Sequence, residues 1–347
     1  MESEIRRLVE SQLGVSVRSI APIAAGLGLR RFFRVATSGS PATLVARVEA
    51  PEDAAGRPAG AAAEPPLEPL RSFLEAAGLP VPARLGGDDA AGIALLEDVG
   101  DATLADAVAR ADAPRRVALY RAVLESIPRL QRLSDPTGRV PAFGRRLDRA
   151  LLRYKGELFA RWSLPSALGR PASEDETRAV HAAFEAIADL VADAPLRLAH
   201  RDLQSHNVHV RDAPTGAPPR IALIDLQGAF LAPPEYDAVA LLRDSYVELP
   251  WPEVEGHLDA LRPALPDAPD PDAFRRRFDL LTLARKGKDH ARFLYAAHDR
   301  RDDRWLAHVP ATARALRTAV PRIAGLDPRL AALADVVARL PEKPCAP

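Results

Sequence analysis

The segment HRDLQSHN at residues 200–207 contains the side chains whose types and spacing are best suited to chemistry. Asp202 and Asn207 lie within it, and Asp225 ends a later apolar run. Phosphoryl transfer needs a carboxylate that orients the acceptor hydroxyl and oxygen ligands that hold Mg²⁺ against the phosphates of ATP. We therefore predict that Asp202 is the catalytic carboxylate and that Asn207 and Asp225 bind Mg²⁺.

Each of these three residues also has an ordinary structural interpretation, because Asp and Asn often cap turns or bond their own backbone. Their joint spacing matches a kinase catalytic loop followed by a metal-binding aspartate, and this favours chemistry. His200 and Asp237 are expected to brace the loop. His206 and His209 flank Asn207 but point different ways on an extended segment, so we do not expect a zinc site.

The elements that must position these residues begin with a helix over residues 1–13 and strands over residues 19–23, 32–37 and 43–48. Alternating apolar residues with Gly or Pro at the ends predict an antiparallel arrangement. An Ala/Pro/Gly-rich stretch over residues 49–69 predicts a loop, followed by a helix over 67–77 and a strand over 93–96. Residues 1–98 are therefore predicted to form a small, nucleotide-binding N-lobe.

Helical periodicity dominates from residue 103 onward, over 104–109, 115–133, 143–158, 174–191 and, with proline breaks, from 236 to about 340. Two short apolar runs, 207–210 and 221–226, predict a hairpin with polar ends. The sequence thus predicts an α+β, two-lobed chain. Its parts are an N-lobe (1–98), a helical C-lobe with the catalytic loop and acceptor site (99–340) and a flexible tail (341–347).

Composition narrows the class of partner. The chain has 347 residues, with 47 Lys plus Arg and 47 Asp plus Glu, so no excess positive charge favours nucleic acid. The single cysteine, Cys345, can form no internal disulfide. The start lacks the pattern of a secretion signal, and no apolar run is long enough to cross a membrane. We expect a cytoplasmic protein that acts on a small molecule. The sequence makes no prediction of its oligomeric state.

The HRD…N segment and the following Ile224-Asp225 resemble the motif pair of aminoglycoside phosphotransferases, which have a protein-kinase-like fold. The residues after them are similar to the N-acetylmuramate/N-acetylglucosamine anomeric kinase group. The matching segments are Gln227, Pro233, Tyr236-Asp237, LLRD at 241–244, GLRRFFR at 28–34, LLEDVGD at 95–101 and RFD at 277–279 with Arg285 and Lys288. The resemblance extends over about residues 20–310.

The resemblance implies Mg·ATP-dependent phosphorylation of a hydroxyl on a small polar metabolite, with the anomeric hydroxyl of a cell-wall amino sugar as the favoured acceptor. Two alternatives stay open: a kinase for aminoglycosides, choline or another small alcohol, and a catalytically inactive nucleotide-binding module. Gly228 and Ala229 follow Gln227 where the sugar kinase group has an acidic residue. This departure concerns the acceptor and leaves the metal-binding residues unchanged.

The phosphate-binding residues depart further from a kinase, because the first lysine of the chain is Lys155. Arg47 is the nearest substitute in the N-lobe, and arginine can chelate phosphate oxygens with a different reach. A plain surface position on a strand is the alternative interpretation of Arg47. Gly26 and Gly28 would let backbone amides approach phosphates, although paired glycines also form plain turns.

The predicted nucleotide site has two further parts. The carboxylate partner of Arg47 would be Glu64 or Glu68, ahead of or within the helix at 67–77. The backbone from Glu97 to Val99, in the connector between the lobes, would receive adenine.

Overall fold

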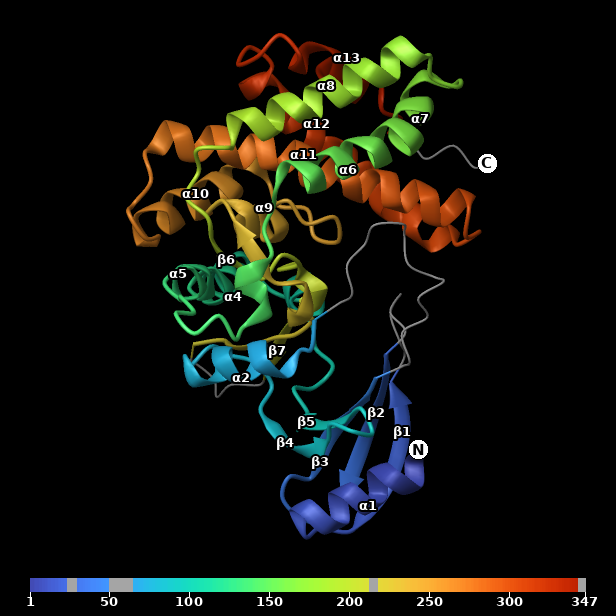
Figure 1. Ribbon diagram of the computed structural model, residues 1–347, viewed down its shortest axis with the longest axis vertical. Helices are drawn as coiled ribbons and strands as arrows, with labels where there is room; N and C mark the ends of the chain where they lie inside the picture. Colours follow the sequence, from blue (N-terminus) through green and yellow to red (C-terminus); the bar gives the residue numbers. More distant parts are fainter. Residues whose placement is uncertain (24–29, 50–64, 212–217, 343–347) are drawn as a thin grey trace.

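The chain folds into a twisted antiparallel sheet and a larger, mostly helical region (Figure 1). The computed structural model describes residues 1–23, 30–49, 65–211 and 218–342. The sheet is built from residues before 98 and most of the helical region from those after it, so the predicted α+β class is confirmed. The exact domain boundaries stay predictions, and most of the predicted tail lies outside the described residues.

Five strands form the N-terminal sheet in the order β1-β2-β3-β5-β4, and every neighbouring pair is antiparallel. Their bounds are β1 Val17–Ile23, β2 Arg31–Thr37, β3 Thr43–Val48, β4 Arg84–Asp88 and β5 Ile93–Glu97. The sequence analysis did not predict β4, because Gly86 and Gly87 interrupt its strand pattern. The four other strands agree with the predicted ones.

Helix α1 (Glu2–Leu13) covers one face of the sheet (Figure 1). Its apolar side chains pack against strand residues such as Phe33 and Val35, and this cluster is the core of the N-lobe. Strand side chains alternate between faces, so Arg34 and Arg47 lie on the opposite face, where Arg34 is paired with Val45 and Arg47 with Phe32. The sheet therefore presents two arginines on the side away from α1.

The connector after β5 is tied to the sheet by Arg34. Its guanidinium donates to Asp98 at 2.8 Å and 3.2 Å and to Asp101 at 2.7 Å and 2.8 Å. Helix α2 (Glu68–Ala76) belongs instead to the helical region, because Leu70 and Leu74 join its hydrophobic core. The sheet and the helical region thus meet at α2 and at this connector.

Helix α11 (Pro271–His298) runs through the centre of the helical region and is buried along most of its length (Figure 1). Helices α6, α8, α9 and α12 pack directly against it, and the other helices of this region share one hydrophobic core with them. The bounds of these helices are α3 Leu104–Ala109, α4 Ala113–Leu124, α5 Ser126–Gln131, α6 Arg149–Leu158 extended by the π-helix η3 Phe159–Ser163, α7 Leu164–Leu168, α8 Glu174–Leu190, α9 Tyr236–Leu242, α10 Trp251–Leu261, α12 Val309–Ile323 and α13 Leu330–Arg339.

Two predicted helices have different bounds in the structure. Residues 115–133 form two helices, α4 and α5, because Pro128 cannot donate the backbone hydrogen bond that would continue α4. Residues 143–148 precede helix α6, which begins at Arg149 because the Asp148 side chain accepts a hydrogen bond from the backbone N–H of Leu151 at 2.8 Å.

Two short antiparallel strand pairs lie between the helices. Strands β7 (Val208–Arg211) and β8 (Arg220–Leu223) form the predicted hairpin, but β8 ends at Leu223. Strands β6 (Arg197–Ala199) and β9 (Phe230–Ala232) were not predicted, since three residues carry no readable periodicity. Among the described residues, no helix combines the length and apolar character needed to cross a membrane.

Helix packing yields a paired prediction about two glycines. A Cβ at Gly156 would lie 2.9 Å from Phe184, whereas a Cβ at Gly256 would meet nothing within 4 Å. We expect Gly156→Ala to lower the free energy of unfolding by about 1–3 kcal/mol through overpacking. Gly256→Ala should raise it by up to about 1 kcal/mol through helix propensity. Urea unfolding of both variants tests this, and shifts in the same direction would contradict the packing described for α6 and α8.

Candidate active site

The backbone of the 200–207 loop is held by the carboxylate of Asp237 in helix α9. The backbone N–H of His200 donates to Asp237 Oδ2 at 2.7 Å, and that of Arg201 donates to Oδ1 at 3.0 Å. Arg201 has a φ of 76°, a left-handed conformation that costs energy in a residue with a side chain. Burial raises the pKa of Asp237, against the opposing effect of His200 and the two N–H donors. Asp237 therefore maintains a strained backbone just before Asp202.

Asp202 faces an open space while one of its oxygens is bound from behind. Arg285 of α11 donates to Asp202 Oδ1 at 2.7 Å and to the carbonyl oxygen of Arg201 at 2.6 Å. The Arg285 side chain is 2% exposed, whereas that of Asp202 is 39% exposed. Burial acts to raise the pKa of Asp202, but the charges of Arg285 and then Lys288 outweigh it and hold this pKa well below its usual value. Asp202 is thus ionised, oriented and accessible.

Asn207 and Asp225 lie beside Asp202. Asn207 Nδ2 donates to the carbonyl oxygen of Asp202 at 2.9 Å and reaches Asp225 Oδ2 at 3.5 Å. Asp225 has a φ of 62°, so the chain turns immediately after β8 and leaves this carboxylate next to the 200–207 loop. The structure therefore brings together the three residues that the sequence selected.

The donor chemistry of this cluster fits a magnesium ion. Asp225 contributes carboxylate oxygens, and the side-chain oxygen of Asn207 accepts no hydrogen bond from the described residues. Mg²⁺ prefers oxygen ligands and completes its shell with waters and nucleotide phosphates, so two protein ligands suffice. The amide of Gln227 now donates to Asp225 Oδ1, and this contact would yield to a metal ion.

A pocket of about 180 Å³ opens beside Asp202. Its apolar wall comes from α6, with Leu151, Tyr154 and Leu158. Its polar wall contains one carboxylate, that of Asp202, and five cationic side chains, which are Lys155, Arg201, Arg285, Lys288 and Arg292. A volume below the roughly 300–1,000 Å³ of drug-sized sites fits a single small molecule.

Burial lowers the pKa values of two lysines that line the pocket. Burial, and next the charge of Arg285, lower the pKa of Lys155 to about 7. Burial also lowers the pKa of Lys288 to about 8, although Asp289 opposes this shift. Both ammonium groups therefore carry their charge at a cost.

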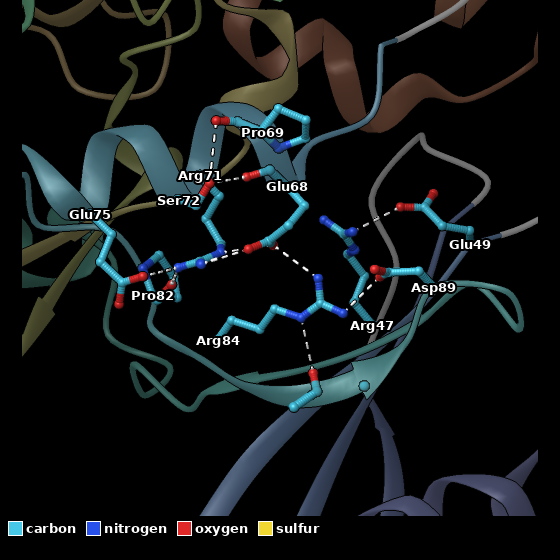
Figure 2. Close-up of polar contacts among 12 residues, drawn as sticks. Arg47, Glu49, Glu68, Pro69, Arg71, Ser72, Glu75, Pro82, Arg84 and Asp89 are labelled. Atoms are coloured by element: carbon cyan, nitrogen blue, oxygen red, sulfur yellow. Dashed lines mark hydrogen bonds and ion pairs between the residues drawn. The ribbon is translucent and has the colours of Figure 1, made fainter. Parts of the chain in front are cut away.

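Arg47, the predicted phosphate ligand of the N-lobe, pairs in the structure with a carboxylate that the sequence analysis did not name. Arg47 is 8% exposed, and its guanidinium pairs with Glu49 at 3.1 Å. Glu68 accepts hydrogen bonds from Arg71 at 2.9 Å and 2.7 Å and lies 3.5 Å from Arg84; Figure 2 shows these contacts. Glu68 is therefore not the ion-pair partner of Arg47 in this structure, because Arg71 on the same helix competes for its carboxylate. Glu64 lies outside the described residues, as do Gly26 and Gly28.

Glu97 and Val99, the two residues predicted to bind adenine through their backbone, differ in whether the backbone N–H is already hydrogen-bonded. The backbone N–H of Glu97 donates to the carbonyl oxygen of Ala83 at 2.8 Å, so it is not available to a base. Val99 makes no backbone hydrogen bond with the described residues. The adenine prediction is thus narrowed to the carbonyl of Glu97 and the backbone of Val99.

The sequence analysis missed the cationic wall of the pocket. Arg285, Lys288 and Arg292 follow one another at helical spacing on α11, so they share one face. Three of the four lysines in the chain, Lys155, Lys286 and Lys288, lie at or next to this site. The helical spacing of Arg285, Lys288 and Arg292 and the clustering of the few lysines were the sequence signals that could have predicted this pocket.

The fold and this site define a kinase-like phosphotransferase. A model of the phosphotransferase enzyme family matches residues 19–273, so the chain belongs to that family and is a small-molecule kinase. N-acetylmuramate/N-acetylglucosamine kinase of Neisseria meningitidis serogroup B is 26% identical over 266 residues, which cover 74% of this chain and 75% of that protein. The resemblance stated from the motifs is thereby confirmed.

Solved structures agree on the fold. A choline/ethanolamine kinase family protein from Mesorhizobium loti has a TM-score of 0.57 and 16% identity, covering 98% of each chain. A variant of aminoglycoside 2'-phosphotransferase-IIIa in complex with GDP has a TM-score of 0.60 and 16% identity, covering 94% of this chain and 99% of that one. The predicted protein-kinase-like fold is therefore confirmed.

Proposed function

We propose that this protein transfers the terminal phosphoryl group of ATP to a hydroxyl of a small polar metabolite in the cytoplasm. The observation that carries the proposal is the convergence of Asp202, Asn207 and Asp225 beside one pocket. Asn207 and Asp225 would hold Mg²⁺, which neutralises the phosphate charge when it is bound with ATP.

Asp202 has the position and charge of the group that orients the acceptor. Arg285 occupies Oδ1, so Oδ2 is the oxygen that would accept the hydrogen bond from the acceptor hydroxyl. The hydroxyl oxygen would bond to the γ-phosphorus as the bond to the β,γ-bridging oxygen breaks, and its proton would pass to Asp202. A carboxylate of low pKa suffices, because a loose transition state requires positioning more than a strong base.

The favoured acceptor is the anomeric hydroxyl of N-acetylmuramate or N-acetylglucosamine, which implies a role in cell-wall recycling. Its support is the 26% identical relative and the motif resemblance over most of the chain. Similarity to the choline and aminoglycoside kinases concerns the fold alone, at 16% identity. These acceptors therefore serve as comparison substrates in the test.

We expect the wild-type protein with Mg·ATP to phosphorylate an N-acetylated amino sugar and to ignore choline and kanamycin. Asp202→Asn should lower kcat by at least about 100-fold, because the acceptor hydroxyl loses its carboxylate partner, while nucleotide binding persists. Coupled measurement of ADP release, with calorimetric titration of ATP, checks both statements. A wild-type protein that binds ATP but turns over no acceptor would support the inactive-module alternative instead.

We further propose that Arg47 replaces the missing lysine as a phosphate ligand. It lies on the sheet face opposite α1, and its buried Nε has no hydrogen-bond partner among the described residues. Arg47→Met should weaken ATP binding by about 10-fold or more through loss of a charge-assisted contact. Arg18→Met, an exposed change on β1 of the same sheet, is the matched control. Equal ATP affinity in both variants would contradict this role.

A further inference from the structure

The acceptor pocket has an excess of positive charge. Asp202 and Arg285 neutralise each other across 2.7 Å, which leaves four further cationic side chains on the wall. Asp289 lies 2.8 Å from Lys288 but also 2.7 Å from Lys286, so one carboxylate serves two ammonium groups. Lys155, Arg201 and Arg292 then remain without a carboxylate within ion-pair distance among the described residues.

The contacts that these three side chains make are with neutral groups or are absent among the described residues, so none of them balances the positive charge. Lys155 is 3% exposed, and its ammonium donates to the phenol oxygen of Tyr236 at 3.1 Å. Arg201 reaches a backbone carbonyl at 3.4 Å and lies over the ring of Phe230. Arg292 is exposed at the pocket and has no hydrogen-bond or ion-pair partner within the described part of the chain. A buried ammonium without a counter-ion is costly, so a molecule in this pocket that brings negative charge would relieve that cost.

We propose that the acceptor carries an anionic group, a carboxylate or a phosphate, which Lys155, Lys288 and Arg292 bind while Asp202 takes its hydroxyl. The proposal rests on the kinase function above and names the charge of its acceptor. Lys155 comes from α6, and Lys288 and Arg292 come from one face of α11, so the group would be held between two helices. The same field disfavours cationic acceptors, because like charges repel strongly in a partly buried site.

The decisive substrates share one hexosamine ring and differ in charge. N-acetylglucosamine is neutral, N-acetylmuramate adds a carboxylate, and N-acetylglucosamine 6-phosphate adds a phosphate. With the full chain and saturating Mg·ATP, we expect kcat/KM to be at least about 10-fold higher for one acidic sugar than for the neutral one. The arm with the higher value identifies carboxylate or phosphate. Added KCl should raise KM for that sugar selectively, because salt screens the attraction.

Arg292→Gln tests the binding residues with little risk to folding, since this side chain is exposed. The ratio of kcat/KM between the acidic and neutral sugars should fall by about 10-fold, and Arg292→Lys should restore part of it. Arg276→Gln is the matched control: it is exposed on the same helix, about 24 Å along the axis at 1.5 Å per residue. It should leave the ratio unchanged.

Calorimetric titration of the three sugars without nucleotide separates this proposal from the kinase function. If no sugar is phosphorylated, the proposed acceptor class fails, but tighter binding of an acidic sugar, lost in Arg292→Gln, would still support the anion site. Equal affinity for all three sugars, or an unchanged preference in Arg292→Gln, would overturn the anion site even if phosphorylation proceeds.

Discussion

The ion pair between Arg285 and Asp202 is the interaction on which the site depends. A guanidinium that is 2% exposed bonds the loop at two points, the Asp202 carboxylate and the Arg201 carbonyl. Removing either charge would leave the other buried without its partner, which is expensive in a protein interior. Helix α11 and the 200–207 loop are therefore fixed relative to each other, and the loop cannot shift without breaking this pair.

This coupling has a consequence for substrate binding. Lys288 and Arg292 follow Arg285 by about one and two turns on α11, so the residues that line the acceptor pocket are positioned by the helix that holds Asp202. On the other side, Asn207 bonds the Asp202 carbonyl and reaches Asp225. The pocket, Asp202 and the proposed metal ligands Asn207 and Asp225 thus lie next to one another around one short loop, an arrangement that would suit in-line transfer between two bound molecules.

Arginine is the main long cationic side chain of the N-lobe, because the first lysine of the chain is Lys155. Arg34 joins the sheet to the connector through Asp98 and Asp101. Arg47 lies on the same face of the sheet, and Arg71 and Arg84 engage Glu68 instead (Figure 2). Planar, multidentate guanidinium groups can bind more than one carboxylate at once, as Arg34 does with Asp98 and Asp101 and Arg84 does with Glu68 and Asp89.

Much of the fold followed from sequence because the signals were local. Alternation predicted β1, β2, β3 and β5, and the spacing of Asp202, Asn207 and Asp225 selected a cluster that the structure brings together. The three-residue strands β6 and β9 were missed because they are stabilised by tertiary contacts that leave no periodic pattern.

Sequence left the carboxylate partner of Arg47 open between Glu64 and Glu68; in the structure Glu68 pairs with Arg71 and Arg47 pairs with Glu49, while Glu64 lies outside the described residues. Which carboxylate a guanidinium chooses depends on competitors such as Arg71, and sequence alone does not place them. The cationic pocket was missed because its residues come from helix α6, the 200–207 loop and helix α11, which are far apart in the chain.

The most direct test of the central claim is the magnesium dependence of nucleotide binding. Calorimetric titration of ATP, with and without Mg²⁺, would compare the wild-type protein with Asp225→Ala and with Asp335→Ala, an exposed control on α13. We expect Mg²⁺ to lower the Kd for ATP in the wild type and the control, and Asp225→Ala to lose about 10-fold or more of this effect. Full retention of the magnesium effect in Asp225→Ala would contradict the metal site and with it the proposed mechanism.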